Sequence, residues 1–156
     1  MNHHWSSESV FYHIYPLGYC GAEHENDGSL AVTNRLHAII DVLDDLVELG
    51  ITAIYLGPVF ESSSHGYDTT NYFQVDRRLG QNHDLKRLSE EIHLRGMRLV
   101  LDGVFNHVGR RFWAFEDVKQ NRELSAYTGW FVDLNFHASN RYNDNFSYAC
   151  WEGHAS

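Results

Sequence analysis

The sequence predicts an α/β fold: a parallel (β/α) barrel with only its first three βα units present, followed by the start of an irregular inserted domain. Short apolar runs alternate with amphipathic helical patterns in the order strand, helix, strand, helix, strand, which is typical of a parallel sheet with right-handed crossovers. The runs end near residues 15, 58 and 102, a spacing of 43 and then 44 residues, as expected for units of similar size. A complete barrel needs about 250 residues, and this chain has 156.

The first unit begins with a strand predicted at 10–15, where β-branched and aromatic residues precede Pro16. The loop at 18–29 is rich in Gly, Glu, Asn and Asp. Its carboxylates suit either a bound cation or plain solvation, and solvation is the simpler interpretation.

An amphipathic helix follows, because apolar residues recur every three or four positions from Leu36 to Val47. Thr33 or Asn34 can cap its start, and Gly50 stands where a left-handed C-cap is favoured. One apolar stripe therefore faces the sheet along this helix.

The second unit begins with a strand at 51–56 and continues into a long polar loop expected at 61–72. A second amphipathic helix comes next, with Asn82 as its cap and Gly96 at its end. The third strand is predicted at 97–101.

The third strand carries the first functional signal. A continuous apolar run leads straight into Asp102, which predicts a strand buried on both faces that emerges at a functional edge. In α/β folds the chemistry lies at the carboxyl ends of such strands. The alternative is that Asp102 only caps the following turn.

The chain changes character after this strand, so we place domain boundaries at 1–110 and 111–156. Apolar residues at 112–118 predict a short helix. The segment 130–136 is the one later strand candidate, and its alternation indicates a half-exposed antiparallel strand in the inserted domain.

Composition excludes several classes of protein. A formal charge of −9 leaves no basic patch for nucleic acid, and no apolar run approaches the ~20 residues of a membrane span. The two cysteines lie far apart, which excludes a disulfide-dense scaffold or a cysteine zinc site. With a polar start that lacks a signal-peptide core, a cytoplasmic location is expected. The many aromatic residues suit either a sugar-stacking surface or a core.

Four segments, taken in order, resemble the alpha-amylase family of glycoside hydrolases (glycoside hydrolase family 13). They are FYHIYP at 11–16, GPVFESSSHGYD at 57–68, the segment 71–80 that begins NYFQVD, and DGVFNH at 102–107. The resemblance covers nearly the whole chain. It implies a (β/α)8 barrel that cleaves or transfers α-glucosidic linkages of an α-glucan or maltooligosaccharide with retention of configuration.

The resemblance also implies that this chain contains no catalytic residue. The family's nucleophile and acid/base follow strands four and five, which lie beyond Ser156. Retaining hydrolysis needs two carboxyl groups about 5–5.5 Å apart, so the chain alone is expected to be inactive.

The same resemblance assigns roles in the substrate-binding site to four residues. Tyr67 gives a ring on which a sugar stacks, and Asp68 lies at the base of the same subsite. His107 donates to a sugar hydroxyl, and Asp102 orients an arginine beside the nucleophile.

Three further residues carry weaker assignments. His65 borders the site, and Asn106 is either a calcium ligand, as in many amylases, or a structural amide. The resemblance thus requires no cofactor but allows Ca²⁺ in the full-length protein, and no metal site is predicted in this chain. Asp76, which precedes two arginines, is expected to form a structural ion pair.

The leading hypothesis is the amino-terminal part of an intracellular, neopullulanase-like or maltodextrin-degrading enzyme, either a hydrolase or a transglycosylase. The alternative is a noncatalytic relative used for binding or assembly. The outer strands of a three-stranded fragment are unpaired, and its inner face, expected to hold Ile54, Leu56 and Val100 or their neighbours, lacks an opposite wall. Self-association through these edges is therefore expected.

Overall fold

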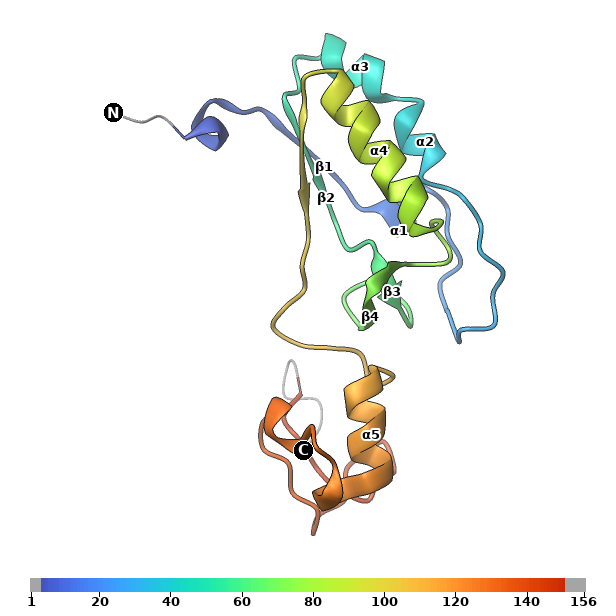
Figure 1. Ribbon diagram of the computed structural model, residues 1–156, viewed down its shortest axis with the longest axis vertical. Coiled ribbons are helices and arrows are strands. Elements are labelled where there is room, and N and C mark those ends of the chain that lie inside the picture. Colours follow the sequence, from blue (N-terminus) through green and yellow to red (C-terminus); the bar gives the residue numbers. More distant parts are fainter. Residues whose placement is uncertain (1–3, 151–156) are drawn as a thin grey trace. The chain divides into compact units, whose positions relative to one another are not determined.

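The structure, a computed structural model, describes residues 4–150 (Figure 1). The chain forms two compact units, Met1–Val104 and Phe105–Ser156, each with its own core. The last six residues of the predicted domain 111–156 lie outside the described residues.

The first unit is built on a three-stranded parallel sheet with the order β1-β2-β5. The strands are β1 (Phe11–Ile14), β2 (Ala53–Leu56) and β5 (Arg98–Leu101). They are the three predicted strands, and the parallel pairing is confirmed. The described residues contain no closed barrel, because β1 and β5 are both edge strands.

The predicted first helix is wrong as a single element. It divides into α2 (His37–Ile40) and α3 (Leu43–Glu48), because Val42 takes φ −105° and ψ 0°, outside helical geometry. Neither Thr33 nor Asn34 caps it, since the residue before α2 is Leu36. The apolar stripe survives the division, with four of its side chains buried: Leu36, Ile39, Leu43 and Leu46.

The second predicted helix is confirmed as α4 (Asn82–Leu94). Its cap is Gln81 rather than Asn82, and Gln81 forms a capping box with Asp84. Gly96 takes φ +73°, the left-handed conformation expected at the helix end. A short helix, α1 (Pro16–Tyr19), follows β1 directly.

Helices α2, α3 and α4 cover one side of the sheet (Figure 1). Ile54 and Leu56 are fully buried in the core on this side, so the expectation that they line the open face is wrong. The pairing register puts His13, Tyr55 and Val100 in one row, on the opposite side because side chains alternate along a strand. The open face is therefore partly polar.

The expectation that β5 is buried on both faces is also wrong. Leu101 is 38% exposed, and Leu99 and Val100 are only partly buried. The reason is that β5 has a neighbour on one edge alone and helices on one side alone.

The polar loop expected at 61–72 is instead part of an antiparallel pair. β3 (Phe60–Ser62) pairs with β4 (Thr69–Val75). β4 is rich in β-branched and aromatic residues, which favour extended structure. Only 63–68, between the two strands, is a loop.

The second unit confirms the predicted helix, α5 (Trp113–Asn121). Two 3-10 turns follow it, η2 (Arg122–Leu124) and η3 (Thr128–Trp130). The strand predicted at 130–136 is wrong: Asn135 makes a single bridge to Ser147, because η3 and the positive φ of Asp133 (+56°) interrupt the extended run. This unit has an aromatic core of Phe112, Phe115, Phe146 and Tyr148.

Cys20 and Cys150 are both free thiols and partly buried. Burial raises the pKa of Cys20 to about 11, although Arg35 opposes the shift. No helix within residues 4–150 is long and apolar enough to cross a membrane.

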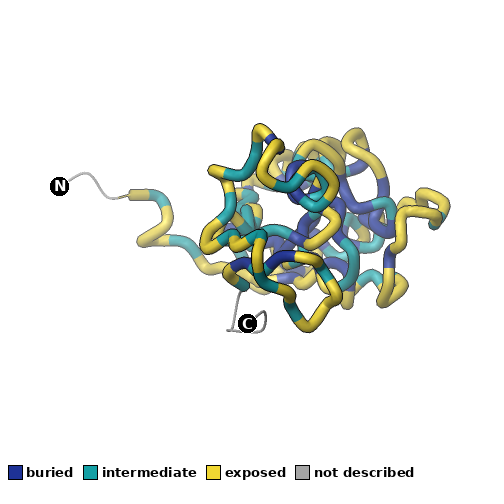
Figure 2. Tube along the Cα trace, turned by 90° about the horizontal axis from the view of Figure 1, so that it is seen from below, coloured by how far each residue is buried: buried dark blue, intermediate teal, exposed yellow. Residues whose placement is uncertain are grey.

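The exposure of β1 predicts that the isolated chain self-associates. Val10, Phe11 and Tyr12 are 52%, 44% and 41% exposed, and the trace through this segment is mostly exposed in Figure 2. Unpaired strand edges attract other chains, and a lysine on the edge opposes this. We expect size-exclusion chromatography with light scattering to show species larger than a monomer, and Tyr12→Lys to reduce them. A sharp monomer peak for the unchanged chain contradicts the prediction.

Candidate functional site

Asp102 directly follows β5, and both of its carboxylate oxygens accept hydrogen bonds. The Tyr55 hydroxyl, from β2, donates to Oδ2 at 2.8 Å. The Val104 backbone N–H donates to Oδ1 at 3.2 Å. These contacts hold the carboxylate at the carboxyl end of the parallel sheet.

The turn after Asp102 is strained. Val104 takes φ +45°, a region that a β-branched residue rarely adopts. Tyr72, from β4, donates its hydroxyl to the Val104 carbonyl at 2.5 Å. The turn is thus bonded on both sides, to the hairpin and to the sheet.

The loop 63–68 is fastened to the ends of β1 and β2. The Tyr15 hydroxyl donates to the His65 carbonyl at 2.9 Å. Gly66 has φ +90° and lies so close to Pro58 that a Cβ there would come within 2.9 Å of the proline Cβ. Only glycine suits this position, which explains the His-Gly-Tyr order.

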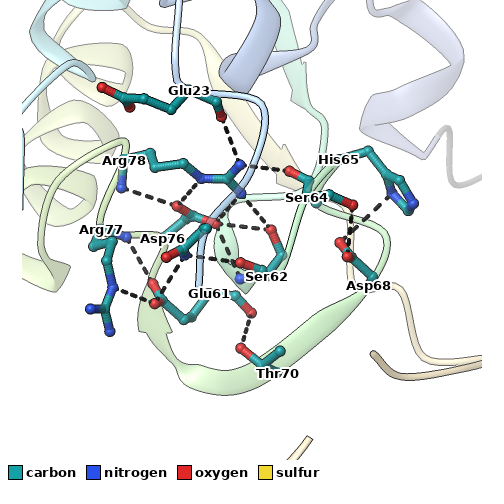
Figure 3. Close-up of polar contacts among 12 residues, drawn as sticks. Glu23, Glu61, Ser62, Ser64, His65, Asp68, Thr70, Asp76, Arg77 and Arg78 are labelled. Atoms are coloured by element: carbon teal, nitrogen blue, oxygen red, sulfur yellow. Dashed lines mark hydrogen bonds and ion pairs between the residues drawn. The ribbon is translucent and has the colours of Figure 1, made fainter. Parts of the chain in front are cut away.

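A buried charged cluster supports the loop from the other side (Figure 3). Arg78 forms a bidentate ion pair with Asp76, with bonds of 2.8 and 2.7 Å, and both side chains are buried. Arg78 also donates to the Ser64 carbonyl at 2.7 Å. Arg77 pairs with Glu61. The prediction that Asp76 forms a structural ion pair is confirmed.

Only one of the two Asp68 carboxylate oxygens accepts a hydrogen bond from the described residues. Ser64 donates to Oδ2 at 2.8 Å, but Oδ1 is buried and has no hydrogen-bond partner among the described residues. The Nδ1 atom of His65 lies 3.8 Å from this oxygen (Figure 3). A buried carboxylate oxygen without a donor is suited to accept a bond from a ligand hydroxyl.

Tyr67 directly precedes Asp68 in the loop. Its side chain is 39% exposed, so its ring is accessible. Its backbone N–H donates to His65 Nδ1 at 3.2 Å, and the two ring centroids are 6.2 Å apart. Burial, and then the negative charge of Asp102, raise the pKa of Tyr67. The Asp102 carboxylate is therefore close enough to Tyr67 for its charge to affect the tyrosine hydroxyl.

The structure thus brings Tyr67, Asp68, His65 and Asp102 to one end of the first unit. His107 is partly buried and Asn106 is exposed. These two residues belong to the second unit, so their place beside the other four stays a prediction. Within residues 4–150, no three His, Cys, Asp or Glu side chains form a group that could hold a metal ion.

Two residues of this end were missed from the sequence. Tyr55 supports Asp102 and Tyr15 supports His65. Tyr55 interrupts an otherwise apolar strand, and a tyrosine hydroxyl in a partly buried position needs a partner. That interruption is the signal that could have identified it.

Residues 13–156 match the model of the alpha amylase catalytic domain. The chain is 40% identical to a cyclomaltodextrinase of Bacillus sp over 141 residues, and this match spans 81% of the chain and 25% of the relative. It is 38% identical to neopullulanase 2 of Thermoactinomyces vulgaris, spanning 91% of the chain and 27% of that protein.

A solved structure shows the same similarity in three dimensions. It is a cyclic α-maltosyl-(1→6)-maltose hydrolase from Arthrobacter globiformis, in complex with cyclic α-maltosyl-(1→6)-maltose. The TM-score is 0.73 at 35% identity, covering 96% of this chain and 36% of that one. The chain spans only about a quarter of the length of the two curated relatives.

Proposed function

Because this chain belongs to the alpha-amylase family, we propose that it is the amino-terminal part of an α-glucan-active glycoside hydrolase or transglycosylase. In this proposal it supplies part of the sugar-binding site, and the nucleophile and acid/base come from the remaining part of the enzyme. Its substrate class is maltooligosaccharides and related α-glucans.

The buried, unbonded Oδ1 of Asp68 is the observation that carries this proposal. A sugar offers a dense set of hydroxyl donors around an apolar ring face. Asp68 accepts from such a hydroxyl, and the exposed Tyr67 ring lies next to it to stack on the sugar. His65 borders this subsite, and His107 is assigned in this proposal to donate to a sugar hydroxyl.

Asp102 does not contact the substrate in this proposal. Its position at the sheet end, with both oxygens bonded, suits a carboxylate that orients a cationic group beside the nucleophile. Glycosidases of the retaining class proceed through a covalent intermediate, so the placement of the nucleophile affects kcat directly.

The names of the relatives support the substrate class. They are a cyclomaltodextrinase and a neopullulanase, and the solved structure holds a cyclic maltosyl saccharide. The proposal includes a cytoplasmic location, which the name of one relative, an intracellular maltogenic amylase of Bacillus subtilis, supports. The proposal requires no cofactor, and Asn106 stays a candidate ligand for Ca²⁺ in the full-length protein.

The test is to express the longer protein and measure reducing ends released from maltotriose, cyclomaltodextrin and pullulan. We expect hydrolysis or transfer of at least one of these substrates. If the longer protein binds maltotriose without turning it over, the chain belongs to a noncatalytic relative and the proposal fails.

The 156-residue chain by itself is expected to have no glycosidase activity. A positioned acid and a nucleophile supply most of the rate acceleration, and in this proposal both lie outside the chain. Purified chain should release no product from maltotriose or an aryl α-glucoside above a mock-purified control. Turnover that copurifies with the chain would falsify this prediction.

A further inference from the structure

Tyr55 lies in the middle of a row that crosses the open face of the sheet. The register pairs it with His13 on β1 and with Val100 on β5. Paired residues of a parallel sheet point to the same side, and so do residues two apart on a strand. Asp102 therefore extends from the same side as Val100 and Tyr55.

The Tyr55 side chain extends along the sheet from that row to Asp102, which lies two residues beyond Val100. Two residues along a strand cover about 6.6 Å, a distance that a tyrosine reaches only with its hydroxyl. The 2.8 Å bond to Asp102 Oδ2 is made across this distance. A phenylalanine of the same shape lacks the atom that makes this bond.

The ring of Tyr55 is itself held in place. The His13 imidazole stacks on it, with ring centroids 4.7 Å apart and an interplanar angle of 21°. The hydrogen bond to Asp102, more than burial, raises the pKa of the Tyr55 hydroxyl. A tyrosine hydroxyl is protonated at neutral pH, and the shift agrees with its donating this bond to Asp102.

We propose that Tyr55 is a positioning residue for the reaction, acting through Asp102: its hydroxyl fixes the carboxylate, and His13 fixes its ring. Without this donor, the one hydrogen bond that Asp102 keeps within residues 4–150 is the 3.2 Å bond from Val104, which lies in the strained turn. The carboxylate is then free to rotate away from the group it orients. This inference rests on the proposed function.

The experiment is a double-mutant cycle in the longer enzyme, with Tyr55→Phe, Asp102→Asn and the combined variant assayed on maltotriose. Tyr55→Phe is expected to lower kcat about tenfold, the loss of one charge-assisted hydrogen bond, with KM changed less than about twofold. In the Asp102→Asn background, Tyr55→Phe is expected to have no further effect on kcat. Tyr12→Phe, on the neighbouring strand, is the matched control and should change neither constant, because within residues 4–150 its hydroxyl makes no hydrogen bond.

The outcomes are distinguishable. An active enzyme with full kcat in Tyr55→Phe overturns this inference and leaves the proposed function intact. Losses of kcat that multiply in the combined variant also overturn it, because Tyr55 then acts independently of Asp102. If Tyr55→Phe fails to fold, as judged by its melting temperature, His13→Ala is measured in its place, because it removes the ring that stacks on Tyr55. A loss of kcat with KM little changed then supports the inference, and full kcat overturns it. An inactive unmodified enzyme overturns both proposals together.

Discussion

Replacing Arg78 by methionine is expected to lower the free energy of unfolding by about 3–5 kcal/mol, because it leaves a buried charge without its partner. The Asp76 side chain is 1% exposed and that of Arg78 is fully buried. Arg78 also bonds to the Ser64 carbonyl, so its loss releases the loop that carries Tyr67 and Asp68.

Urea unfolding followed by near-UV circular dichroism measures this loss. Lys86→Met is the matched control, since Lys86 is a 77% exposed cation 3.7 Å from Glu90 and such a pair contributes at most about 1 kcal/mol. Arg78→Met combined with Asp76→Asn is expected to cost less than Arg78→Met alone, because no unpaired charge is then buried. Equal costs for Arg78→Met and Lys86→Met would show that the cluster does not support the loop.

In the longer enzyme, Asp102→Asn is expected to lower kcat about a hundredfold and to change KM much less. The carboxylate is assigned to orient a neighbouring group rather than to bind substrate, and a misplacement of about 1 Å at a reacting centre costs on the order of a hundredfold. Loss of kcat without a matching rise in KM marks an interaction made in the transition state.

His107→Ala is also expected to lower kcat more than it raises KM. His107 is assigned to donate a hydrogen bond to a sugar hydroxyl, and such a bond affects kcat most when it is strongest in the transition state. Steady-state kinetics on maltotriose measure both variants. His93→Ala is the control, because His93 is exposed in the last turn of α4. If either variant keeps full kcat, the site assignment of that residue is withdrawn.

The sequence by itself determined the elements that depend on local periodicity. Three strands, the apolar stripe from Leu36 to Leu46 and helix α4 follow from apolar spacing, and the left-handed glycines Gly50 and Gly96 follow from helix termination. Local patterns suffice here because each of these elements buries one apolar face, and the spacing of its own residues defines that face without reference to the element it packs against.

Only the tertiary structure decided the features that join distant residues. The hairpin that replaces the polar loop forms by pairing Ser62 with Thr69. The burial of Arg78 depends on backbone oxygens from two separate loops, those of Ser64 and Glu23. The bond from Tyr55 to Asp102 joins positions 47 residues apart, through a register that only the assembled sheet establishes. The order of the motifs predicted that Asp68 and Asp102 belong to one candidate site. Which of their carboxylate oxygens accept hydrogen bonds depends on the tertiary structure, because the spacing of residues along the chain carries no information about contacts between distant segments.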